Sequence, residues 1–185
     1  RLPVVVGLVE GGAFGATVTF VPVAARAAGL AFAPFFVAYS ATLILTRLVG
    51  GRIVDRPDRS RVLAPFLLVG AAALALVAVA TGRLPLAVPG LLFGLAHGVL
   101  YPVMSALAID LARPEHRGRA VGLFSLAFSA GANLLVMLYG LAADRWGYGA
   151  MFAAAAASLA AAAGYAARYS SSRGWSIWAR WRRPE

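Results

Sequence analysis

Long apolar runs separated by short clusters of Arg limit what this chain can fold into. Each run is long enough to cross roughly 30 Å of hydrocarbon as an α-helix. The runs are rich in Ala and Leu and lack the period-two alternation of membrane β-strands, which would also be about half as long. The sequence therefore predicts an all-α membrane protein with six transmembrane helices. They cover approximately residues 3–22, 32–50, 62–81, 85–109, 119–142 and 148–167.

The composition argues against a soluble protein. Of the 185 residues, 61% are hydrophobic and 13% are charged, whereas soluble domains average roughly 25% charged residues. A soluble globule of this size could not hide so much apolar surface from water. A disordered chain is excluded as well, because disordered chains are poor in apolar residues. There is no Cys, so disulfides, thiolate metal sites and Cys nucleophiles are excluded.

The Arg residues predict the orientation in the membrane. The net charge is +10 and all 17 basic residues are Arg, with Arg26, Arg83 and Arg145 on one predicted side. By the positive-inside rule the side richer in Arg faces the cytoplasm. We therefore expect a multi-pass protein of the plasma (inner) membrane with both termini cytoplasmic, and no nucleic-acid partner. The cytoplasmic set is Arg1, Arg47, Arg52, Arg56, Arg59, Arg61, Arg113, Arg117, Arg119, Arg168, Arg173, Arg180, Arg182 and Arg183.

A short internal repeat divides the predicted helices into two units. Residues 51–56 and 140–145 both read Gly-x-x-x-Asp-Arg, and each copy ends the middle helix of a three-helix unit. The two copies fall on opposite predicted sides of the membrane, as in inverted transporter repeats. We therefore expect residues 1–168 to form a six-helix domain of two inverted three-helix repeats. Residues 169–185 form a basic, Trp-containing cytoplasmic tail, either an interfacial segment or a disordered one.

Three segments resemble the major facilitator superfamily. Residues 51–61 resemble its signature loop, Gly-x-x-x-Asp-Arg-x-Gly-Arg-Arg/Lys, although Asp58 stands where the family has Gly. Residues 117–122 resemble the entry to the fifth helix of a six-helix half, and residues 140–152 resemble the fifth-to-sixth connection. The resemblance implies half of a twelve-helix fold. We expect the carboxy-terminal half, with a half-size protein that pairs with a second copy as the alternative.

Glu10 and His97 are the ionisable residues that stand deepest in the apolar runs. Such groups are costly in a bilayer and need an explanation. Glu10 could couple proton flow to solute movement, or it could simply bond a neighbouring helix or line a wet cavity. His97 lies in a Gly90, Gly94, Gly98 stripe that favours close helix packing. Its imidazole could titrate, bond a solute, or serve packing alone.

Other polar residues near mid-depth are candidates for the same pathway. Tyr101 lies one helical turn after His97 on the same face, and Tyr39 and Asn133 belong to the second and fifth runs. Each could bond a solute or tie helices together. The third and sixth runs lack comparable residues apart from Ser158, which can bond its own backbone. We therefore expect four helices to line a pathway and two to face lipid.

The Arg-rich cytoplasmic loops are candidates for gating. In the resembled family, the acid and the Arg groups of the signature loop contact neighbouring helix ends and hold one face of the protein closed. Charge pairs and helix-end amides supply the attraction. The alternative is that these Arg residues only set the topology. The gating candidates are Gly51, Asp55, Arg56, Arg59, Arg113 and Arg117.

The favoured function is secondary active transport of a small solute by alternating access. A nucleotide-binding loop of the Gly-x-x-x-x-Gly-Lys type is missing. An ion gradient, most simply of protons, would therefore supply the energy for efflux or uptake, or the protein would be a facilitator. Expected partners are a small-molecule substrate, the bilayer, and the missing six-helix half or a second copy. One alternative is a fragment or scaffold without transport activity of its own.

An intramembrane enzyme is disfavoured. Ser105, Ser125 and Ser129 lie outside any Gly-x-Ser-x-Gly motif, and His97 and His116 are too few for a metal site. We therefore expect no catalytic residue, metal or cofactor.

Overall fold

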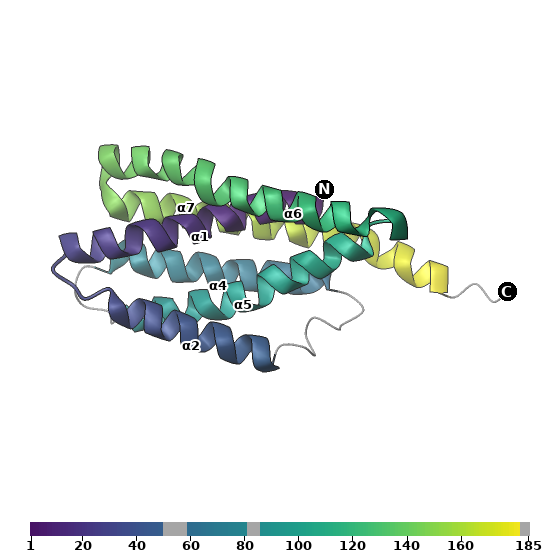
Figure 1. The fold of residues 1–185 in the computed structure, drawn as a ribbon, viewed down its shortest axis with the longest axis horizontal. Coiled ribbons are helices and arrows are strands. Elements are labelled where there is room, and N and C mark those ends of the chain that lie inside the picture. Colours follow the sequence, from purple (N-terminus) through teal and green to yellow (C-terminus); the bar gives the residue numbers. More distant parts are fainter. Residues whose placement is uncertain (50–58, 81–85, 182–185) are drawn as a thin grey trace.

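The fold is helical throughout the part of the chain that the structure describes. The computed structural model describes residues 1–49, 59–80 and 86–181, with side chains up to residue 171. The expected all-α class is confirmed, and no strand occurs in these ranges (Figure 1). The helices are α1 (Leu2–Ala27), α2 (Ala33–Val49), α4 (Ser60–Val79), α5 (Ala87–Asp110), α6 (Arg117–Ala130) and α7 (Val136–Trp181), with a 3-10 turn η1 (Pro114–His116) and a π-helix η2 (Gly131–Leu135).

Four helical segments are long and apolar enough to cross a membrane, among the residues described. They are Leu2–Ala27, Ser60–Val79, Ala87–Asp110 and Pro114–Ser171. The fourth segment contains α6, η2 and most of α7 and has 58 residues, whereas a single crossing needs about 20. The apolar α2 is described over 17 residues. The expected six separate transmembrane helices are therefore not confirmed, because the fifth and sixth runs fall in one continuous helical segment.

Gly147 interrupts that continuous element. Its φ of 82° and ψ of 167° are not helical, and a positive φ is open to Gly without the steric cost that a Cβ would bring. Figure 1 shows the chain reversing direction between the green and the yellow-green parts of this long segment. The reversal lies between the expected fifth and sixth runs, so the helices on its two sides pack back along the bundle.

The last helix continues well beyond residue 167. The hydroxyls of Ser170 and Ser171 donate to the carbonyls of Ala167 and Arg168, each at 2.9 Å. These bonds keep the small polar residues within the helix, and no Pro follows before Pro184. The segment expected as a separate tail, 169–185, therefore begins inside α7, which ends at Trp181.

Glycine rows set the closest helix contacts. A Cβ built at Gly11 would meet the carbonyl of Phe128 on α6, and one at Gly94 would meet the carbonyl of Tyr39 on α2. Small residues permit such backbone contact between membrane helices. As a result α1 packs on α6 and η2, while α5 packs on α2, and α4 packs on α5 and α7. The rows are Gly7, Gly11 and Gly15 on α1 and Gly90, Gly94 and Gly98 on α5.

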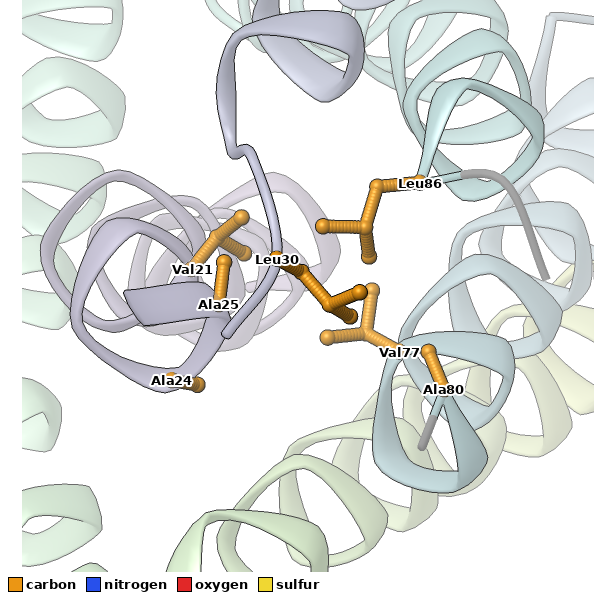
Figure 2. Close-up of a pocket in the computed structure, with 7 residues that line it drawn as sticks. All are labelled: Val21, Ala24, Ala25, Leu30, Val77, Ala80 and Leu86. Carbon is orange, nitrogen blue, oxygen red and sulfur yellow. The ribbon is translucent and has the colours of Figure 1, made fainter. Parts of the chain in front are cut away.

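The two ends of the bundle differ in character. The start of α1, the start of α6 and the end of α7 lie at one end (Figure 1). Toward the other end, a small cavity between α1, α4 and the start of α5 is lined by apolar side chains (Figure 2). Because its lining side chains are all apolar, none of them can form a hydrogen bond to a polar solute. Its lining residues are Val21, Ala24, Ala25, Leu30, Val77, Ala80 and Leu86.

Candidate functional site: a buried carboxyl–imidazole pair

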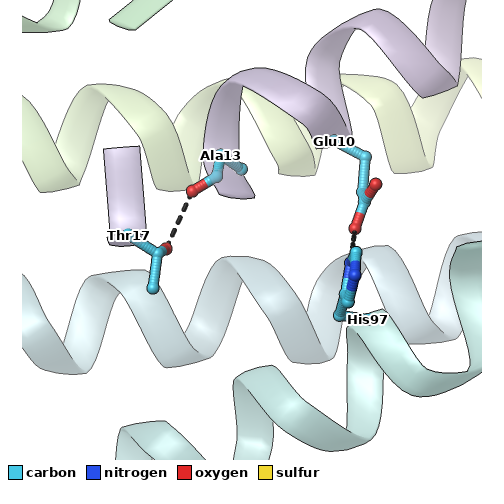
Figure 3. A network of polar contacts seen from close by, with 4 residues as sticks. All are labelled: Glu10, Ala13, Thr17 and His97. Carbon is cyan, nitrogen blue, oxygen red and sulfur yellow. Dashed lines mark hydrogen bonds and ion pairs between the residues drawn. The ribbon is translucent and has the colours of Figure 1, made fainter. Parts of the chain in front are cut away.

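Glu10 on α1 and His97 on α5 meet inside the bundle. A hydrogen bond joins Oε1 of Glu10 to Nδ1 of His97 (Figure 3). Glu10 is 2% exposed and His97 is 6% exposed. Polar groups this deeply buried are expected to be bonded, because an unpaired one costs free energy. Each side chain therefore satisfies part of the hydrogen-bonding capacity of the other, although the two residues lie 87 positions apart in the sequence.

The two residues occupy equivalent places in the two glycine rows. On α1 the sequence reads Gly7-Leu-Val-Glu10-Gly11, and on α5 it reads Gly94-Leu-Ala-His97-Gly98. Residues three and four positions apart share a helix face, so each polar side chain projects beside a row of close contact. These rows bring the backbones of α6, η2 and α2 close to α1 and α5.

The second carboxyl oxygen of Glu10 is not satisfied. Oε2 is buried and has no hydrogen-bond partner among the residues that the structure describes. Leaving such an atom unpaired costs about 1–3 kcal/mol, and more if it is charged. Thr17 does not relieve it, because the Thr17 hydroxyl donates to the Ala13 carbonyl at 2.8 Å (Figure 3). Oε2 of Glu10 can therefore accept a hydrogen bond from one further donor.

Aromatic rings surround the imidazole of His97. Phe14 stacks on it, with ring centroids 4.9 Å apart and planes inclined by 17°. The faces of aromatic rings are electrically negative and attract cations. Rings from α1, α2, α5 and α6 thus favour a positive charge beside Glu10. The rings with centroids within 6.4 Å of that of His97 are Phe14, Tyr39, Phe93, Tyr101 and Phe128.

The structure gathers all but one of the sequence-predicted pathway residues. Tyr39 and Tyr101 belong to the aromatic ring set around His97, which Glu10 bonds. Asn133 stands apart: its side-chain amide donates to the Ser129 carbonyl at 2.7 Å within the same helical segment. That bond lies at the π-helix η2, where the backbone departs from the regular α-helical bonding. The sequence reasoning did not identify Phe14, Phe93 or Phe128 as neighbours of His97.

A charge pair joins two helix ends at the Arg-rich end of the bundle. Nη1 of Arg59, just before α4, lies 2.6 Å from Oδ2 of Asp110, the last residue of α5. Arg113 and Arg117 are exposed between α5 and the first turn of α6. Asp110 was not among the expected gating residues, although an acid beside an Arg cluster was a visible signal. The expected gating residues Gly51, Asp55 and Arg56 lie outside the described residues.

The sequence model of the Major Facilitator Superfamily matches residues 4–176. The chain belongs to the Major Facilitator Superfamily. A comparison with curated proteins finds no match to it. Members of this superfamily are membrane transporters that handle small solutes within a lipid bilayer, so this chain is part of a membrane transport protein. Among the described residues, this superfamily member has no group of three or more side chains suited to bind a metal ion.

Proposed function

We propose that the chain forms a six-helix half of a secondary active transporter, which moves a small solute by alternating access and carries its coupling proton on the Glu10–His97 pair. The observation that carries the proposal is the hydrogen bond between these two side chains, buried between α1 and α5. Ionisable groups at such depth in membrane helices are expensive and commonly mark ion pathways or proton relays.

The pair is suited to carry one proton. With one proton shared between the carboxyl and the imidazole, the pair has no net charge, wherever that proton lies. Removing the proton leaves a buried negative charge, which is costly in a medium of low dielectric constant. Release is therefore favourable after a movement that admits water or a cation to Glu10. Alternating access provides such a movement.

The packing supports two inverted three-helix repeats. The first helix of each unit packs on the middle helix of the other: α1 on α6 and η2, and α5 on α2. In this arrangement the break at Gly147 separates the fifth crossing from the sixth. Glu10 and His97 then lie at equivalent positions of the two units. A rocking movement of one unit against the other changes the contact between them.

The Arg59–Asp110 pair is suited to act as a gate at the Arg-rich end. Asp110 is half exposed, and exposed ion pairs contribute about 0–1 kcal/mol each. Such a contact can break and reform in each transport cycle. Asp55, Arg56, Arg113 and Arg117 belong to the same proposed gate. By the positive-inside rule this end faces the cytoplasm of the inner membrane, with both termini on that side.

A second wall of the pathway comes from another half or a second copy. The fifth crossing exposes a stripe of large apolar side chains together with Asn133. We propose that this stripe faces the other half and lipid, with Asn133 reaching the pathway. The competing function is a scaffold or fragment without transport of its own, which the same exposed stripe would also fit. The stripe consists of Leu123, Leu126, Leu134, Met137, Leu138 and Leu141.

Accessibility of Asn133→Cys to a charged maleimide tests the proposal without a known substrate. The full-length protein, free of other cysteines, is placed in liposomes and labelled from one side over a range of pH. Because only the thiolate reacts and its fraction rises with pH, each rate is divided by that of free cysteine at the same pH. We expect this ratio to depend on pH in the wild-type background and in Glu115→Gln, and to lose that dependence in Glu10→Gln. Unchanged pH dependence in Glu10→Gln would remove Glu10 as the coupling site.

A further inference from the structure

The free oxygen of Glu10 lies beside aromatic rings that are not fully enclosed. Oε2 is buried and unpartnered among the described residues. Phe93 is 3% exposed, but the other rings around His97 are only partly buried. An incoming group can therefore approach the pair past these rings when the bundle moves. The partly buried rings are Phe14, Tyr39, Tyr101 and Phe128.

A carboxylate among aromatic faces selects for a cation. Cation–π attraction favours a positive group near the faces of Phe or Tyr, and an ammonium N–H donates a strong, charge-assisted bond to a carboxylate. The imidazole of His97 now fills the centre of this aromatic set and bonds Oε1. A ligand that satisfies both features would have an apolar body and an ammonium group with at least one N–H, able to donate to Oε2.

We propose that this site binds a hydrophobic organic amine in its ammonium form, in exchange for the proton that Glu10 and His97 share. The inference rests on the proposed proton site and adds the chemical class of the solute. Because the ligand and the proton compete for the same carboxylate, the two would be exchanged across the membrane rather than carried together.

Charge balance sets the exchange at one for one. Before binding, the pair holds one shared proton and is neutral. After binding, the ammonium N–H donates to Oε2 of ionised Glu10, the imidazole of His97 is neutral, and the shared proton has left to water. The net charge at the buried site is zero in both states, which avoids the large cost of an isolated buried charge. No covalent bond forms or breaks in the ligand.

Few other ionisable groups face the pair. Tyr39 of α2 and Tyr101 of α5 contact the imidazole, and Tyr39 interacts electrostatically with Glu10 and with Arg47. From α6 the contacting ring is Phe128, which has no charge. Arg61, Arg117 and Arg119 lie in the first turns of α4 and α6, and Asp144 and Arg145 adjoin the Gly147 break. The one other charged residue of these helices whose side chain is described is Arg168 of α7.

Calorimetry of the full-length protein in nanodiscs tests the exchange. The probes are benzyldimethylammonium, benzyltrimethylammonium and the neutral isostere neopentylbenzene, each titrated in buffers of different ionisation enthalpy. We expect both cations to bind, the protonated amine more tightly, and the neutral isostere about tenfold or more weakly. Binding of either cation should release about one proton. Equal binding of the neutral isostere, or no proton release, would overturn the proposal.

Matched variants separate the carboxylate from the rings. Glu10→Gln should weaken cation binding about tenfold or more and abolish proton release, whereas Glu115→Gln, in the exposed loop, should change neither. Phe14→Leu should weaken binding while proton release persists. Phe20→Leu, on the same helix but against Tyr148, should bind as wild type does. If Glu115→Gln or Phe20→Leu matched the site variants, the assignment would fail.

Histidine NMR of the wild-type protein needs no variant and distinguishes the two proposals. We expect the cation to shift the ring-nitrogen resonances of His97, because its imidazole then no longer shares a proton with Glu10, while those of exposed His116 are unaffected. His97 resonances that show the hydrogen bond to Glu10 but ignore the cation would overturn the amine proposal and leave the proton site standing. Ring-nitrogen resonances without any sign of that hydrogen bond would overturn both.

Discussion

At the scale of residues, Glu10 and His97 each reduce the free-energy cost of burying the other. Each is ionisable, each is more than nine-tenths buried, and each would be costly without a partner. Their hydrogen bond offsets part of the free-energy cost of burial, whereas Oε2 of Glu10 stays buried without a partner among the described residues. The remaining unpaired oxygen is the feature that separates this pair from a purely structural tie, because it leaves one acceptor for a ligand.

Breaking the pair from one side should destabilise the protein far more than replacing it. Removing one partner from a buried pair typically costs about 3–5 kcal/mol, whereas exchange of both for apolar residues of similar size is often neutral or stabilising. We therefore expect His97→Phe, which leaves Glu10 unpaired, to lower the thermal unfolding midpoint strongly in detergent. The double variant Glu10→Met/His97→Phe should recover it. Additive effects of the two changes would show that the side chains do not interact.

The Arg59–Asp110 pair should matter for movement rather than for stability. Because the pair is exposed, Asp110→Asn should change the free energy of unfolding by about 1 kcal/mol or less. The same variant should increase the rate at which Asn133→Cys is labelled from the Arg-rich side, since one closing contact is lost. Asp144→Asn, an exposed aspartate beside the Gly147 break, is the control. A charge exchange, Arg59→Asp with Asp110→Arg, should restore the slow rate if the contact is the cause.

The individual residues of the site could be predicted, but their pairing could not. An acid or a histidine within an apolar run is conspicuous, so Glu10 and His97 were identified as candidates separately. Their contact depends on how α1 and α5 cross, which one sequence does not specify. The matched motifs Gly7-x-x-Glu10-Gly11 and Gly94-x-x-His97-Gly98 were the signal that could have joined them. The Asn133 amide bonds the carbonyl four residues before it, a local alternative that a polar residue at mid-depth does not distinguish from a bond to another helix.

At the scale of elements, the glycine rows decide how closely the helices approach. The contact between α1 and the fifth crossing is tight in both directions: a Cβ at Gly11 would meet the Phe128 carbonyl, and one at Gly131 would meet the Leu8 carbonyl. Gly131 is also the first residue of the π-helix η2. The irregular backbone therefore begins at buried Gly131, where α1 crosses.

Gly11→Ala should separate α1 from α6. The new methyl group would overlap the backbone of Phe128, which cannot move aside as a flexible side chain could, so we expect a loss of about 1–3 kcal/mol. Gly122→Ala, on α6 with open space around it, should be neutral or slightly stabilising because Ala favours helix. Thermal unfolding in the same detergent compares the two. A neutral Gly11→Ala would show that the helices lie further apart than described.

The helices were predictable to the extent that apolar length marks them. The runs at 3–22, 62–81 and 85–109 coincide with α1, α4 and α5 with small shifts at their ends. The break between the fifth and sixth runs was expected from Asp144, Arg145 and the nearby glycines, and the helix ends there through the backbone of Gly147 alone. The helical continuation of α7 to Trp181 fits the interfacial segment, one of the two expectations for residues 169–185, because charged and polar residues end an apolar run without ending a helix.

At the scale of the whole molecule, the Arg residues and the fold give the same division into two ends. The structure places the start of α1, the start of α6 and the end of α7 together (Figure 1), and these segments contain or adjoin many Arg residues. The connection between α1 and α2, with Ala31 exposed, belongs to the opposite end. Because the ends are set by helix packing and the charges by sequence, their agreement supports a single orientation in the membrane.

Site-directed labelling tests that orientation directly. The chain has no Cys, so Ser60→Cys, Ser171→Cys and Ala31→Cys each introduce one thiol into it. In right-side-out vesicles, a membrane-impermeant maleimide should react with Ala31→Cys. If the Arg-rich end faces inward as we propose, Ser60→Cys and Ser171→Cys should react only after the membrane is opened. If Ser60→Cys and Ser171→Cys reacted from different sides, the helices between them would make an odd number of crossings. Gly147 would then not separate two membrane crossings. That result would contradict the proposed inverted repeats, and with them the equivalent positions of Glu10 and His97.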